Sequence, residues 1–97
     1  MRLTEKEIEI ILDISQKSFG NLKIWLFGSR VYDDKKGGDI DLYIETDKDI
    51  KLLDRIKFIT NLQLLIGNRK IDVIFNMPKS GNRTIFNTAK EEGILLC

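Results

Sequence analysis

Polar and apolar residues alternate from Asp39 to Leu42, and Tyr43-Ile44 continue this run. Because successive side chains of a strand point to opposite faces of a sheet, the alternation predicts a β-strand with one buried and one open face. A strand of this kind needs partners. Two further segments, at 22–27 and 70–75, are short, apolar and bounded by glycine or proline, which predicts two more strands, the first of them buried and central. The chain must therefore build a sheet.

Helical patterns separate the predicted strands. Thr4 and Glu7 have the spacing of a capping box, which predicts a helix that runs to about Ser18 and ends at Gly20. A second helix is predicted from about Ile50 to Ile66, ending at Gly67-Asn68. Its expected N-cap is Asp47 or Asp49, and its expected inner face consists of Leu53, Ile56, Ile59 and Leu62 or Leu64.

A third helix is predicted over residues 82–92, with Gly93 as its C-cap and 94–96 as a short tail or edge strand. Because helices alternate with strands, we expect an α/β fold in the loose sense (α+β), a small mixed sheet backed by helices. At 97 residues, the chain has room for one domain, residues 1–97.

Composition restricts the possible partners. Sixteen Lys+Arg against fifteen Asp+Glu give a net charge of +1, so binding of nucleic acid by bulk electrostatics is not expected. With no histidine and one cysteine, Cys97, a Cys/His metal site and an internal disulfide are both excluded. Any metal would be a hard, oxygen-bound ion such as Mg²⁺. No apolar run approaches the roughly 20 residues that span a bilayer, and a cytoplasmic location is predicted.

Three aspartates carry the candidate chemistry. Asp39 and Asp41 share one face of their strand, and Asp72 joins that face if its strand lies alongside. Each alone also fits a solvated strand face. Together, however, three such carboxylates repel by about 2 kcal/mol per pair at an effective dielectric near 20. Divalent cations reverse this repulsion, and a two-metal site for phosphoryl chemistry needs such a cluster.

The turn Gly28-Ser29-Arg30 follows the first strand. Gly28 allows the backbone to approach a ligand closely, Ser29 offers a hydroxyl, and the following N–H groups can bind a phosphate if a helix begins there. Arg30 adds positive charge. Alone, this turn is better explained as a plain end of a strand, but combined with the aspartates on successive strands it favours a nucleotide site.

The chain resembles the minimal nucleotidyltransferases of the DNA polymerase beta superfamily over nearly its whole length. The residues that carry the resemblance are Leu26 to Arg30, Gly38 to Ile44, Ile71 to Phe75, Ile85-Phe86 and Ala89 to Leu96. The resemblance implies the nucleotidyltransferase fold. It implies that Gly28 and Ser29, with Arg30, bind the phosphates of a nucleoside triphosphate. It also implies that Asp39, Asp41 and Asp72 ligate two Mg²⁺ ions, Asp72 holding the one that activates the attacking hydroxyl.

Similar proteins act as antitoxins beside a HEPN-domain toxin, which implies transfer of AMP from ATP to a tyrosine of such a partner. Two alternatives stay open. The chain could neutralise a partner by binding alone, or it could modify a hydroxyl of a nucleic acid or a small molecule. The balanced charge disfavours a nucleic-acid acceptor, and the single domain disfavours a small-molecule acceptor. We expect Tyr43 to be half-buried at a sheet edge rather than stacked on a base, and Lys70 to be solvated rather than bound to phosphate.

Overall fold

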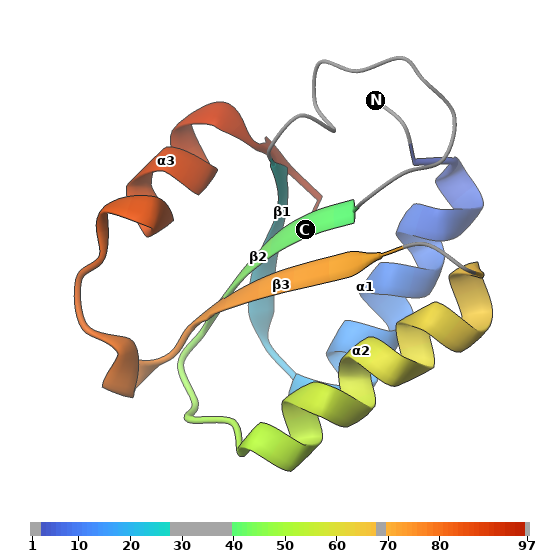
Figure 1. Cartoon of the computed structure of the whole chain (residues 1–97), viewed down its shortest axis with the longest axis horizontal. Helices are drawn as coiled ribbons and strands as arrows, with labels where there is room; N and C mark the ends of the chain where they lie inside the picture. Colours follow the sequence, from blue (N-terminus) through green and yellow to red (C-terminus); the bar gives the residue numbers. More distant parts are fainter. Residues whose placement is uncertain (1–2, 28–39, 68–69, 97) are drawn as a thin grey trace.

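The computed structural model describes residues 3–27, 40–67 and 70–96. Gly28, Ser29, Arg30 and Asp39 lie outside the described residues. The predicted elements are all present (Figure 1). In chain order they are α1 (Glu5–Phe19), β1 (Leu22–Phe27), β2 (Ile40–Thr46), α2 (Leu52–Ile66), β3 (Ile71–Asn76), the 3₁₀ turn η2 (Pro78–Ser80), α3 (Thr84–Glu92) and β4 (Ile94–Leu95).

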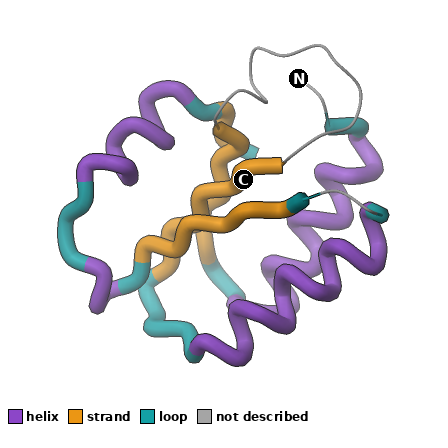
Figure 2. Tube along the Cα trace, in the orientation of Figure 1, coloured by secondary structure: helices purple, strands orange, loops and turns teal. Residues whose placement is uncertain are grey.

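The four strands form one mixed sheet in the order β3-β2-β1-β4. β1 runs antiparallel to both β2 and β4, whereas β2 and β3 are parallel. β1 therefore lies inside the sheet, as predicted, and residues 94–95 form the predicted edge strand. The sheet separates the helices into two layers, with α1 and α2 on one face and α3 on the other (Figure 2). The predicted α+β architecture is confirmed.

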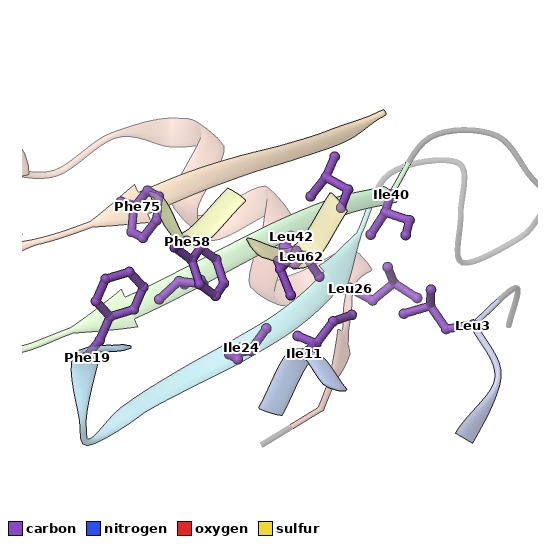
Figure 3. Close-up of a cluster of buried hydrophobic side chains, with 12 residues drawn as sticks. Leu3, Ile11, Phe19, Ile24, Leu26, Ile40, Leu42, Phe58, Leu62 and Phe75 are labelled. Atoms are coloured by element: carbon purple, nitrogen blue, oxygen red, sulfur yellow. The ribbon is translucent and has the colours of Figure 1, made fainter. Parts of the chain in front are cut away.

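The main core lies between the sheet and the pair α1 and α2. The alternating apolar residues of β1, β2 and β3 face this layer, and Phe19 packs against Phe58 and Phe75 with ring centroids 5.0 and 5.7 Å apart (Figure 3). The predicted inward positions of β3, Ile71, Val73 and Phe75, all belong to this core. The burial of these side chains provides most of the driving force that fixes the strand register.

A smaller core lies on the opposite face, under α3. It consists of Trp25, Tyr43, Phe86 and Ala89. The ring of Tyr43 lies 5.2 Å from that of Trp25 and 5.6 Å from that of Phe86. Tyr43 is fully buried on an inner strand, so the prediction of a half-buried edge position was wrong. The alternation of β2 correctly separates the two faces, but α3 covers the second face from Tyr43 onward.

The helix termini are partly as predicted. At α1, the Glu7 N–H donates to Thr4 Oγ1 (3.1 Å) and the Thr4 N–H donates to Glu7 Oε1 (2.9 Å), which confirms the capping box. At α2, neither predicted aspartate caps the helix, since Lys51 occupies the N-cap without a side-chain bond. Asp49 Oδ1 instead accepts a hydrogen bond from the Lys79 N–H at 2.9 Å, and so ties the end of β2 to η2.

The inner face of α2 also differs from the prediction. Phe58 and Leu62 are its buried residues, with Ile59 partly buried. Leu53, Ile56 and Leu64, which were expected inside, are 61%, 49% and 78% exposed. The reason is that α2 is apolar around most of its circumference, so the spacing alone does not choose a face. Within the described ranges, none of the helices is long and apolar enough to cross a lipid bilayer.

Candidate nucleotidyltransferase site

The structure brings Asp41 and Asp72 together. They are register partners in the parallel pairing of β2 with β3. Neighbouring strands lie about 4.8 Å apart, and register partners point to the same face of the sheet. Asp41 is half-buried and Asp72 is exposed. Both lie near the beginnings of their strands, on the face that α3 covers farther along. The two carboxylates therefore meet at an open end of this face.

The end of β1 reaches the same edge of the sheet. Phe27, the last residue of β1, is the register partner of Asp41, and Gly28 follows it directly in the chain. At the start of β2, the Ile40 N–H donates to the Lys70 carbonyl at 2.8 Å, and Asp39 directly precedes Ile40. The end of β1 and the beginnings of β2 and β3 thus meet at one end of the sheet. The positions of Gly28, Ser29, Arg30 and Asp39 lie outside the described residues, and their roles stay predictions.

Lys70 contributes positive charge at this edge. Its Nζ lies 3.9 Å from Asp72 Oδ2, and the two side chains are 68% and 53% exposed. As predicted, Lys70 is solvated. Exposed pairs of this kind contribute about 0–1 kcal/mol, so Lys70 offsets only part of the repulsion between the two aspartates. A divalent cation would offset far more.

The donor set fits Mg²⁺, because carboxylate oxygens are the hard ligands that this ion prefers. The described part of the chain contains no group of three or more acidic, histidine or cysteine ligands that could hold a metal. The predicted third ligand, Asp39, is adjacent to the described range.

A polar network that the sequence analysis missed lies at the other end of β2 and β3. The Tyr43 hydroxyl donates to Glu45 Oε2 (2.9 Å) and accepts from Asn76 Nδ2 (3.0 Å), while Lys90 Nζ lies 3.0 Å from Glu45 Oε2. It borders an open pocket of about 510 Å³, whose wall includes Arg83, the N-cap residue of α3. Only the i, i+2 spacing of Tyr43 and Glu45 signals this network in the sequence.

Two pKa values in this network are shifted. Burial raises the pKa of Tyr43 to about 12, and the hydrogen bond to Glu45 adds to this effect although the Asn76 bond opposes it. For Glu45, burial alone would raise the pKa, but hydrogen bonds from Lys90 and Tyr43, with the charges of Lys90 and Lys23, hold it below its usual value. Tyr43 is therefore a neutral donor to an ionised Glu45 at pH 7. This arrangement connects α3 to the sheet and is separated from the two aspartates along the strands.

Comparison with solved structures shows a shared fold. A chain in the tri-AMPylated HEPN toxin of Shewanella oneidensis in complex with MNT antitoxin has 18% sequence identity and a TM-score of 0.70, over 98% of this chain and 72% of that one. A chain in a toxin–antitoxin structure with AMP-PNP has 17% identity and a TM-score of 0.74, over 93% and 72%. A chain in the MntA–HepT toxin–antitoxin structure has 16% identity and a TM-score of 0.71, over 97% and 72%.

The sequence matches no curated protein. It does match a family profile, described as "Polymerase beta, Nucleotidyltransferase", over residues 9–97. This match includes both described aspartates and the strands that position them. The chain therefore belongs to the polymerase beta nucleotidyltransferase family.

Proposed function

We propose that this chain is a Mg²⁺-dependent nucleotidyltransferase that transfers AMP from ATP to a hydroxyl of a partner protein. The proposed acceptor is a tyrosine of a HEPN-domain toxin, so the chain acts as the antitoxin, in the cytoplasm where ATP is available. The observation that carries the proposal is the register pairing of Asp41 with Asp72 at the edge where β1 ends. The family match and the similarity to toxin–antitoxin structures, one tri-AMPylated and one with AMP-PNP, support it.

Each candidate residue has a role in this proposal. Asp41 and Asp72, with Asp39, hold Mg²⁺, and Gly28, Ser29 and Arg30 bind the β- and γ-phosphates. When bound, Mg²⁺ polarises the phosphate oxygens and compensates the charge that develops on the attacking and leaving oxygens. Because Asp41 and Asp72 are register partners on one face of the sheet, both carboxylates would contribute ligands to the same Mg²⁺ site.

The transfer itself is a displacement at the α-phosphorus of ATP. The acceptor oxygen forms a bond to this phosphorus while the bond to the bridging oxygen of the β-phosphate breaks, and pyrophosphate leaves. The acceptor loses its proton, which the carboxylate of Asp72 would help to orient or accept before it passes to water. The products are a phosphodiester of the acceptor, pyrophosphate and a proton. Because β3 is an edge strand of the sheet, a protein acceptor can approach Asp72 from the side.

A labelling experiment tests the proposal. ATP labelled at the α-phosphate is added with Mg²⁺ to host lysate that contains the wild type, Asp41→Asn, Asp72→Asn or the control Asp13→Asn. Asp13 is an exposed acid paired with Lys17 on α1, so its replacement changes the same charge elsewhere on the surface. We expect one labelled protein band with the wild type and the control, and a loss of about 100-fold or more with the other two.

The chemical class of the labelled molecule distinguishes the candidate functions. A labelled nucleic acid or small molecule in place of a protein would replace the proposed acceptor. No labelled product, together with a partner that co-purifies equally with the wild type and with Asp72→Asn, would favour the alternative, neutralisation by binding alone. The exposed apolar side chains of α2 are the observation that favours this alternative.

A further inference from the structure

One edge of the sheet is open beside the candidate site. β3 pairs with β2 on one side, and no strand of the described ranges lies on its other side (Figure 1). An edge strand presents unpaired backbone N–H and C=O groups, and proteins usually cover such an edge or place charges along it. Asp72, a candidate metal ligand, lies on this strand.

The register shows which backbone groups of β3 point outward. The Ile40 N–H donates to the Lys70 carbonyl, and Ile40 is the register partner of Ile71. In a parallel pair, alternate residues of a strand direct both backbone groups toward the neighbouring strand. The even-numbered residues of β3 therefore turn their groups toward β2. The odd-numbered residues turn theirs away from the sheet, and these are Ile71, Val73 and Phe75.

The far half of this outer edge is covered by the chain itself. The Ser80 hydroxyl of η2 donates a long hydrogen bond to the Phe75 carbonyl, at 3.4 Å. No residue of 3–27, 40–67 or 70–96 bonds to the outward groups of Ile71 or Val73. The open stretch therefore runs from Ile71 to Val73, and Asp72 lies at its centre.

The proposed chemistry requires an acceptor on this side of the site. The proposed phosphate-binding residues begin directly after Phe27, the β1 residue that pairs with Asp41. Asp72 pairs with Asp41 from the opposite side, on β3. The attacking and leaving oxygens of a phosphoryl transfer lie roughly in line, on opposite sides of the phosphorus. With pyrophosphate leaving on the β1 side, the acceptor oxygen arrives from the β3 side.

We propose that the outer edge of β3 binds an extended segment of the acceptor protein, which adds a strand to the sheet. Strand addition takes its affinity from main-chain hydrogen bonds, here with Ile71 and Val73, and its specificity from alternate side chains. The added residue that pairs with Asp72 turns its side chain to the face of Asp72 and Asp41, at the inter-strand spacing of about 4.8 Å. That residue carries the acceptor hydroxyl. The inference rests on the proposed function and names how its acceptor is recognised.

A proline substitution tests the edge and leaves both aspartates in place. Because the Val73 N–H points outward, Val73→Pro removes a donor for the added strand and keeps the hydrogen bonds between β2 and β3. Proline is tolerated at such positions of edge strands, and it favours an extended conformation for the preceding residue, Asp72. The matched control is Val73→Ala, which also loses the valine side chain but keeps the N–H.

The substrate for both variants is the purified acceptor protein that the labelling experiment identifies. We expect Val73→Pro to raise KM for this acceptor about tenfold relative to Val73→Ala, because it loses one hydrogen bond and its ring stands where the added strand lies. The affinity for AMP-PNP with Mg²⁺ should be equal in the two variants. An equal KM would overturn the proposal.

Amide hydrogen exchange of the wild type gives a second readout, which decides the question even if Val73→Pro does not fold. Exchange is followed by NMR in the free protein and in its complex with the acceptor, without ATP. In the free protein, the N–H groups of Ile71 and Val73 should exchange faster than that of Ile74, which donates to β2. Acceptor binding should slow exchange at Ile71 and Val73 about tenfold or more.

Unchanged exchange at both positions in the saturated complex would overturn the proposal. Slow exchange at both positions in the protein alone, with a dimeric mass in light scattering, would overturn it in favour of a second copy that pairs β3 with β3.

The outcomes separate this inference from the proposed function. Labelling of an acceptor that gives no protection at the β3 edge would overturn strand addition and leave the proposed function intact. If the wild type labels nothing, the co-purifying partner replaces the acceptor in the exchange experiment. Protection of the β3 edge by that partner would support strand addition without transfer. Lack of protection, or of any partner, would overturn strand addition as well.

Discussion

The substitution Tyr43→Phe separates a structural from a catalytic role for this residue. Tyr43 lies two residues after Asp41 on the same side of β2, where an aromatic ring could also stack on a nucleotide base. In the structure its ring is buried between Trp25 and Phe86. Because phenylalanine keeps the ring, the apolar packing terms nearly cancel between the two proteins. The substitution therefore measures the hydroxyl alone.

The size of the effect follows from the two hydrogen bonds of that hydroxyl. In one of them the hydroxyl donates to the carboxylate of Glu45, and in the other it accepts from the side-chain amide of Asn76. Bonds to charged groups contribute about 1.5–3 kcal/mol, and neutral ones about 1. In the variant, Glu45 keeps its contact with Lys90 at 3.0 Å, and water can enter from the adjacent pocket. Part of the free energy of the two lost hydrogen bonds is therefore recovered. We expect a loss of about 1–2 kcal/mol, a fall in melting temperature of about 5–10 °C.

The difference in stability between wild type and Tyr43→Phe should depend on pH in two windows. Folding raises the pKa of Tyr43 from 10.0 to about 12. The contribution of the protonated hydroxyl to the free energy of unfolding is therefore complete below pH 10 and is lost as the pH rises toward 12. Folding lowers the pKa of Glu45 from 4.5, so its contribution is present above pH 4.5 and is lost as the pH falls through the folded value. The difference should form a plateau between these limits and fall on both sides.

Urea unfolding at a series of pH values measures this profile, and ultraviolet titration of tyrosinate, wild type against variant, measures the Tyr43 pKa directly. Transfer activity at pH 7 should stay within about twofold of wild type at a temperature where both proteins are folded. An unchanged melting temperature combined with a large loss of transfer would refute the reasoning, because Tyr43 would then act on the nucleotide rather than in the core.

Three further substitutions test separate parts of the structure. Asp72→Asn should change the free energy of unfolding by no more than about 1 kcal/mol in thermal denaturation, since its ion pair with Lys70 is exposed, although transfer is lost. Gly93→Ala should destabilise by about 2 kcal/mol or more, because a Cβ there would meet the carbonyl oxygen of Ala89 and, at 2.9 Å, that of Leu26; a variant as stable as wild type would contradict this contact. Thr4→Ala should cost about 1 kcal/mol in chemical unfolding through loss of the capping box, and an unchanged midpoint would show that the cap contributes nothing.

The features that sequence predicted correctly are those with local causes. The α1 cap depends on two residues three apart, and β1 depends on one apolar run, so both were placed within a residue or two. The burial of Tyr43 was missed because Phe86, which covers it, lies 43 positions along the chain. The role of Asp49 was missed for the same reason, since its partner Lys79 belongs to a turn after β3. Long-range packing decides both, and local spacing does not report it.

The candidate site shows the same division. The alternation of β2 predicted the face on which Asp41 lies, but the meeting of Asp41 with Asp72 requires β2 and β3 to be adjacent and parallel. The conditional prediction that Asp72 joins this face is met by the sheet order. The roles of Gly28, Ser29, Arg30 and Asp39 stay predictions, because they lie outside the described residues.

The parallel pairing also explains why α2 is exposed. If β3 ran antiparallel to β2 over the same span, Asp72 would pair with Ile44 in place of Asp41, and the two aspartates would be about 10 Å apart along the strands at 3.3 Å per residue. Parallel strands bring the two aspartates together, but they require a crossover connection, usually a helix. In this chain that connection is α2, which packs against α1 and the sheet on one side only. The crossover that brings the two aspartates together is thus a helix on the opposite face of the sheet, and its outer side leaves large apolar side chains open to solvent.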